Sequence, residues 1–84
     1  MLERGTVVRS LAGRDKDKLL AVMQVSENLV TVCDGKERPV DRPKSKNIRH
    51  VKEVGFTLTE QDTSSDRLLK KALARLNAEI NGNT

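Results

Sequence analysis

The densest run of chemically active side chains lies between residues 35 and 52. Seven lysines and arginines stand there against two carboxylates, Glu37 and Asp41, which gives this stretch a net charge of +5. Arginine can grip a phosphate through two N–H donors and lysine acts as a point charge, so the pattern favours contact with a sugar–phosphate backbone. The other interpretation is a lysine-rich sheet edge that prevents strand-to-strand aggregation. The candidate binding residues are Lys36, Arg38, Arg42, Lys44, Lys46, Arg49 and His50.

A second group of charges follows Gly13, where three cations alternate with Asp15 and Asp17. A glycine at this point lets the chain turn and allows the backbone to approach a ligand closely. The charges would then contact phosphates. Alternatively, the segment is a solvated hairpin tip whose charges pair with one another. The candidate binding residues of this loop are Arg14, Lys16 and Lys18.

The chain offers no residue set that suits catalysis. It contains one histidine and one cysteine, and its carboxylates have no spacing that acid–base or nucleophilic chemistry requires. We therefore expect no enzyme, no catalytic residue, no metal and no cofactor. His50 could contact a bound nucleic acid, or it could be a partly buried structural residue at the end of a strand. Cys33 is expected to be a half-buried apolar side chain beside the Asp34-Gly35 turn.

The charge is concentrated in the front of the chain. Residues 1–52 hold twelve Lys or Arg against seven Asp or Glu, a net of +5, whereas residues 53–84 hold four against five, a net of −1. Nucleic acid and anionic lipid both fit a basic front. Phe56 is the only aromatic residue, and proteins that bind single strands usually stack bases on aromatic rings. If the partner is a nucleic acid, we therefore expect recognition of its shape and phosphates rather than of its base sequence.

The 84 residues suffice for one small domain with a thin aliphatic core. Residues 1–4 lack the apolar run of a signal peptide, no stretch is long and apolar enough for a membrane helix, and a single cysteine suits a reducing compartment. The expectation is a soluble cytoplasmic protein with no membrane partner and no small-molecule substrate.

Short apolar segments joined by turns predict a mainly β fold. We expect strands over residues 6–11, 19–25, 29–33 and 36–40, with a charged loop over 12–18. Residues 19–25 contain a continuous apolar run, which indicates a strand buried on both faces. Asp34-Gly35 is a strong hairpin signal that shapes the turn into the fourth strand. Residues 41–47 are expected to form a basic loop around Pro43, and residues 48–51 a closing strand. Residues 55–59 are either a short strand or an extended strap.

The last predicted element is a helix over residues 64–81, with Thr63 and Asp66 at the spacing of a capping box. One apolar stripe runs along it, formed by Leu69, Leu73, Leu76 and Ile80. The stripe either covers one end of the β framework or docks onto another protein.

Three stretches together resemble the small bacterial KOW-domain RNA-binding proteins, which are related to an SH3-like ribosomal protein of the large subunit. They are residues 5–25, residues 34–40 and the segment Pro43-Lys44-Ser45-Lys46 with Ile48-Arg49-His50-Val51. The resemblance implies a five-stranded SH3-like barrel over residues 1–59, followed by a C-terminal helix and tail over 60–84. It also implies ribosome association and binding to structured RNA, with ribosomal RNA and ribosomal proteins as expected partners. The KOW pattern usually carries a glycine where this chain has Asp17.

A protein-interaction module of the translation or transcription machinery is the competing hypothesis. Docking would then use the apolar stripe of the helix. Salt distinguishes the two, because phosphate contacts weaken steeply with salt, by about 0.7 log unit of affinity per log unit of salt for each single-strand phosphate. Apolar docking would be nearly indifferent to salt.

Overall fold

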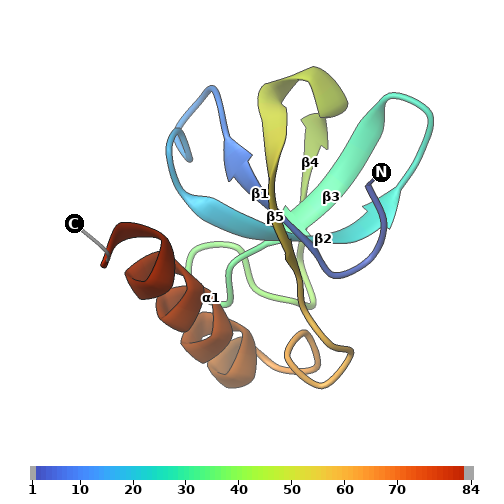
Figure 1. The fold of residues 1–84 in the computed structure, drawn as a ribbon. Coiled ribbons are helices and arrows are strands. Elements are labelled where there is room, and N and C mark those ends of the chain that lie inside the picture. The colour runs from blue at the N-terminus through green and yellow to red at the C-terminus, as the bar shows by residue number, and fades with distance from the viewer. Residues whose placement is uncertain (1, 83–84) are drawn as a thin grey trace.

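The computed structural model describes residues 2–82 as a five-stranded antiparallel sheet followed by an α-helix (Figure 1). The strands are β1 (Thr6–Ser10), β2 (Leu19–Val25), β3 (Leu29–Cys33), β4 (Lys44–Asn47) and β5 (Val51–Thr57). A 3₁₀ turn, η1 (Ile48–His50), joins β4 to β5, and the helix is α1 (Asp66–Asn81). The predicted mainly β fold with a C-terminal helix is confirmed.

The strand order is β4-β3-β2-β1-β5, and every neighbouring pair is antiparallel. The sheet is strongly curved (Figure 1). Its edge strands β4 and β5 are not paired with each other within residues 2–82, so the sheet stays open. The fold is compatible with a small barrel, although backbone hydrogen bonds do not complete one.

The predicted strand over residues 36–40 is wrong. This segment forms bends, and β4 lies instead at Lys44–Asn47, inside the region predicted as a loop. The Asp34 side chain accepts hydrogen bonds from the backbone N–H groups of Lys36 and Arg38, each at 2.9 Å. These bonds replace a β ladder with a compact turn, because an Asp side chain competes well with the backbone for its own neighbours.

The region after β4 also differs from the expectation. Residues 48–50 form η1 rather than a strand, and the Asn47 side chain accepts a 2.9 Å hydrogen bond from the Arg49 N–H at the start of this turn. The closing strand and the proposed strand at 55–59 are parts of one element, β5, which pairs with β1 across a bulge between Thr6 and Val8.

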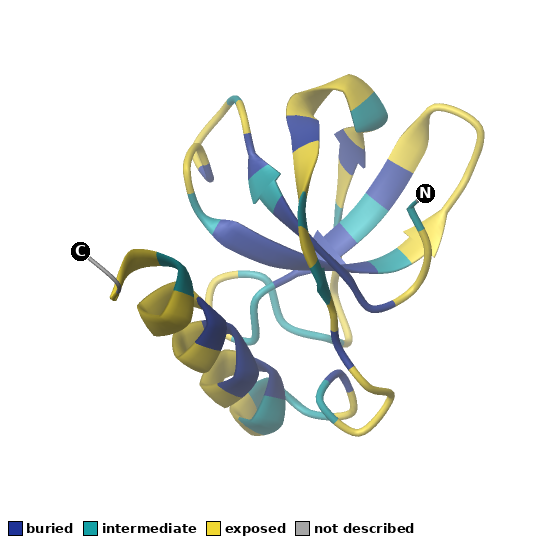
Figure 2. Cartoon of the chain, viewed as in Figure 1, coloured by how far each residue is buried: buried dark blue, intermediate teal, exposed yellow. Residues whose placement is uncertain are grey.

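Strand β2 divides the core in two, because successive side chains of a strand point to opposite faces. Leu19 and Ala21 pack toward the helix, whereas Leu20 and Val22 pack into the concave side of the sheet. All four are buried, which confirms burial on both faces for this half of the strand (Figure 2). A chain of 84 residues thereby obtains two small aliphatic clusters instead of one.

Helix α1 begins at Asp66, two residues later than predicted, and Ser65 caps it by accepting a 3.2 Å hydrogen bond from the Leu68 N–H. Its buried face is Leu69, Ala72, Leu73 and Leu76, with Ile80 partly buried beside them. These side chains share one cluster with apolar residues of the sheet. Within residues 2–82, no helix has both the length and the apolar character needed to cross a bilayer.

Candidate nucleic-acid interface

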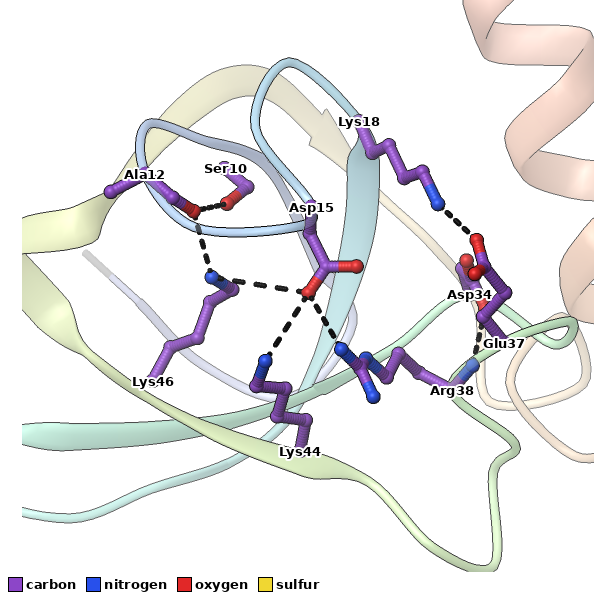
Figure 3. Close-up of polar contacts among 9 residues, drawn as sticks. All are labelled: Ser10, Ala12, Asp15, Lys18, Asp34, Glu37, Arg38, Lys44 and Lys46. Carbon is purple, nitrogen blue, oxygen red and sulfur yellow. Dashed lines mark hydrogen bonds and ion pairs between the residues drawn. The ribbon is translucent and has the colours of Figure 1, made fainter.

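The centre of the basic region is a buried carboxylate, Asp15, on the loop between β1 and β2. Only 2% of this side chain is exposed. Three of the predicted cations converge on its Oδ2 atom (Figure 3). The Arg38 Nη2 lies 3.4 Å away, the Lys44 Nζ 3.8 Å and the Lys46 Nζ 3.9 Å. One carboxylate therefore organises three positive charges and leaves a local excess of two.

The β1–β2 loop is folded tightly enough to hold this carboxylate inward. Backbone N–H groups of Lys16 and Asp17 donate to the carbonyls of Gly13 at 3.2 Å and Ser10 at 2.8 Å. The backbone is left-handed at Gly13, with φ of 78°, and also at Asp17, with φ of 72°. The sequence therefore places a glycine at one position of the loop that needs this conformation and an aspartate at the other.

Lys46 is a correction to the predicted site. Its side chain is only 7% exposed, and its ammonium donates a 3.1 Å hydrogen bond to the Ala12 carbonyl while facing Asp15. Lys46 thus ties β4 to the β1–β2 loop and is not available to a ligand. A lysine this deeply buried needs a carboxylate and a carbonyl partner to offset the loss of water.

Segment 34–43 approaches the same cluster from the other side and is fixed to the start of α1. The Val40 N–H donates a 2.7 Å hydrogen bond to the Asp66 side chain. Gly35, with φ of 81°, lies so close to the helix that an added Cβ would collide with the Asp66 carbonyl oxygen. The Asp34-Gly35 pair predicts a turn that favours glycine at position 35. The structure adds a second reason for glycine there, the close approach of two backbones.

A groove of about 540 Å³ opens along this segment. Four of the seven lining residues are cations from the predicted set. The one lining carboxylate, Glu37, forms an ion pair with Lys18. The groove is lined by Lys36, Glu37, Arg38, Pro39, Arg42, Pro43 and Lys44.

The Lys18–Glu37 pair links the two loops across the surface. The hydrogen bond from Lys18 lowers the pKa of Glu37, and the same bond raises the pKa of Lys18. Both side chains are well exposed, so this pair orients the loops without adding much stability. The charges of the β1–β2 loop therefore pair mainly with residues of segment 34–46, not with one another as the hairpin-tip interpretation assumed.

The remaining predicted residues do not line the groove. Arg14 and Lys16 are exposed on the β1–β2 loop, and Arg49 and His50 are exposed on η1. The Leu11 N–H donates a 2.8 Å hydrogen bond to the His50 carbonyl, which holds η1 beside the start of that loop. The interpretation of His50 as a partly buried residue is wrong, because His50 lies exposed on η1.

A second groove, of about 400 Å³, is lined by residues of both loops and of α1. It includes Lys70 and Asn77 of the helix, which are not among the predicted site residues. No pattern in the sequence indicates that Lys70 lies near Lys18 and Lys36, because the juxtaposition depends on how α1 docks.

Cys33 is fully buried in the core beneath the helix. Burial, together with the negative charges of Asp34 and Asp66, raises the pKa of its thiol to about 12. Within residues 2–82 no cluster of His, Cys, Asp and Glu side chains could hold a metal ion. The basic groove is the candidate site in which predicted cations gather.

Comparison of the chain with protein-family models and with curated proteins found no match.

Proposed function

We propose that this chain is an RNA-binding protein of the KOW type, associated with the ribosome, that holds structured RNA by phosphate contacts and shape. The observation that supports it best is the groove along residues 36–44, which four cations line and where two of them, Arg38 and Lys44, lie within 4 Å of the buried Asp15 carboxylate. An RNA backbone carries one charge per nucleotide, and a groove of fixed cations suits such a polymer.

The proposed barrel type rests on the strand arrangement and on Asp17. The Lys46 hydrogen bond and ion pair join β4, one edge strand of the open sheet, to the β1–β2 loop. Asp17 has a left-handed backbone at the position where the KOW pattern usually has glycine. A residue that adopts the conformation of the glycine it replaces favours the resemblance.

The apolar stripe of α1, the surface expected for the competing docking function, is not exposed. Leu69, Leu73 and Leu76 are buried against the sheet, so the stripe of α1 is already occupied by the chain's own core. The structure therefore favours RNA over a protein partner docked on this stripe.

The test is binding of a fluorescently labelled RNA hairpin, measured by anisotropy over a series of salt concentrations. Replacing Lys36, Arg42 and Lys44 together with Gln should lower affinity about tenfold or more at low salt. The dependence of log affinity on log salt should become shallower by roughly one for each phosphate contact removed. The matched control carries the same charge change on the exposed face of α1, in Arg67, Lys71 and Arg75, which line neither groove.

Equal losses in the groove variant and the helix variant would mean that overall charge, not the groove, drives binding. A wild-type chain that ignores the hairpin in dilute buffer would refute the proposal. Co-sedimentation with purified ribosomes tests the ribosomal part separately.

A further inference from the structure

The basic groove contains one arginine whose hydrogen bonding is incomplete. Within residues 2–82, the buried Nε–H of Arg38 has no hydrogen-bond partner, although the Nη2 of the same guanidinium reaches Asp15. Buried N–H groups are nearly always paired, and an unpaired one in a basic groove indicates a place for an anionic acceptor. The Arg38 side chain as a whole is 24% exposed and lines the groove, so a ligand in the groove can contact this side chain.

Asp15 also holds a second groove residue, Lys44, at 3.8 Å. The carboxylate is nearly inaccessible, whereas Lys44 is 38% exposed, so the negative charge lies beneath the cations that face the groove. Arg38 precedes Pro39 in the chain and Lys44 follows Pro43. Both side chains nevertheless lie within 4 Å of the same oxygen of Asp15. A fixed pair of cations loses less side-chain freedom on binding than two mobile ones.

We propose that Arg38 and Lys44 form a phosphate subsite of the groove and that Asp15 is its positioning residue. This inference rests on the proposed function for the identity of the ligand, a phosphodiester of RNA. Asp15 does not touch the phosphate. It anchors one edge of the Arg38 guanidinium, leaves its Nε–H for an acceptor, and keeps the Lys44 ammonium beside it.

The proposal predicts an effect opposite in sign to that of charge alone. Asp15→Asn makes the chain more positive by one, which by itself should strengthen RNA binding. If Asp15 positions the subsite, affinity for the RNA hairpin should instead fall about tenfold, the loss of one well-placed charged contact. The control is Asp41→Asn, which changes an exposed aspartate of segment 34–43 and should raise affinity by about twofold or less.

Because Asp15 is buried, its replacement could also unfold the chain. The double variant Asp15→Asn with Lys46→Met removes the buried carboxylate and the buried ammonium together and keeps the net charge. The fold of each variant is checked by circular dichroism. A folded double variant should still bind about tenfold more weakly than wild type, since Arg38 and Lys44 have lost their anchor.

The wild-type chain provides a readout that needs no variant. In ¹H–¹⁵N spectra recorded during titration with the RNA hairpin, the Arg38 Nε–H signal should shift more than the Arg49 Nε–H signal. An unmoved Arg38 signal, or an Asp15→Asn chain that binds as tightly as Asp41→Asn, would overturn the subsite while leaving RNA binding intact. Absence of any binding by the wild type would instead count against the proposed function.

Discussion

The ammonium of Lys46 lies 3.9 Å from the carboxylate of Asp15, and both side chains are buried between β4 and the β1–β2 loop. The two residues come from elements that share no backbone ladder, since β4 pairs only with β3 in the described sheet. Their contact and the Lys46 bond to the Ala12 carbonyl join β4 to the β1–β2 loop. The same contact fixes the carboxylate that collects the other cations.

Lys46→Ala should destabilise the fold. The change removes a buried hydrogen bond and one of three counter-charges of Asp15, so we expect a loss of about 1–3 kcal/mol in the free energy of unfolding. Urea denaturation followed by circular dichroism measures it. Lys44→Ala is the matched control, because Lys44 is half-exposed and should cost less than about 1 kcal/mol. Equal losses in the two variants would show that the burial of Lys46 carries no energetic weight.

Asp17→Gly should stabilise the chain. The φ of Asp17 is 72°, a conformation that glycine adopts without the steric penalty of a Cβ. We expect a gain of about 0.5–1 kcal/mol, or a rise of a few degrees in Tm. Asp17→Ala keeps the Cβ and removes the same charge, so it should give no gain. If alanine stabilised the fold as much as glycine, charge relief and not backbone conformation would be the cause.

Gly35→Ala should be more damaging than Gly55→Ala. Both glycines have positive φ, 81° and 89°, but a Cβ at Gly35 would collide with the Asp66 carbonyl, whereas a Cβ at Gly55 meets no atom of residues 2–82 within 4 Å. Backbone strain alone should cost about 1 kcal/mol at Gly55, and the forced separation of segment 34–43 from α1 should add about 1–2 kcal/mol at Gly35. Thermal unfolding of the two variants side by side measures the difference.

Native Cys33 should resist thiol reagents at pH 8. Burial raises the pKa of this thiol from 9.0 to about 12, so the reactive thiolate is scarce in the folded chain. The folded state holds its proton where the unfolded state releases it. The thiol's contribution to stability is therefore fully present below pH 9 and is lost as the pH rises toward 12. Ellman's reagent with and without urea provides the measurement, and fast labelling of the native chain would contradict this burial.

The local patterns of the chain were sufficient for β2, β3 and α1. Alternating or continuous apolar runs of β-branched residues specify strands, and an apolar stripe with a hydroxyl cap specifies a helix, because both signals act over neighbouring residues. Over residues 36–51 the local patterns predicted the wrong elements. There the local conformation depends on the side chains of Asp34 and Asn47. They accept hydrogen bonds from backbone N–H groups, and these bonds favour bends and a 3₁₀ turn over strands.

The sequence by itself determined that cations concentrate between residues 35 and 52 and that the framework presenting them is mainly β. Only the tertiary structure decided which of these cations face a ligand. Its position between Arg14 and Lys16 predicts that Asp15 is an exposed loop residue. Asp15 is instead buried, because Arg38, which lies 23 positions away in the chain, contacts its carboxylate together with Lys44 and Lys46. Burial of a charge depends on partners brought together by the fold, and such partners leave no signal in local spacing.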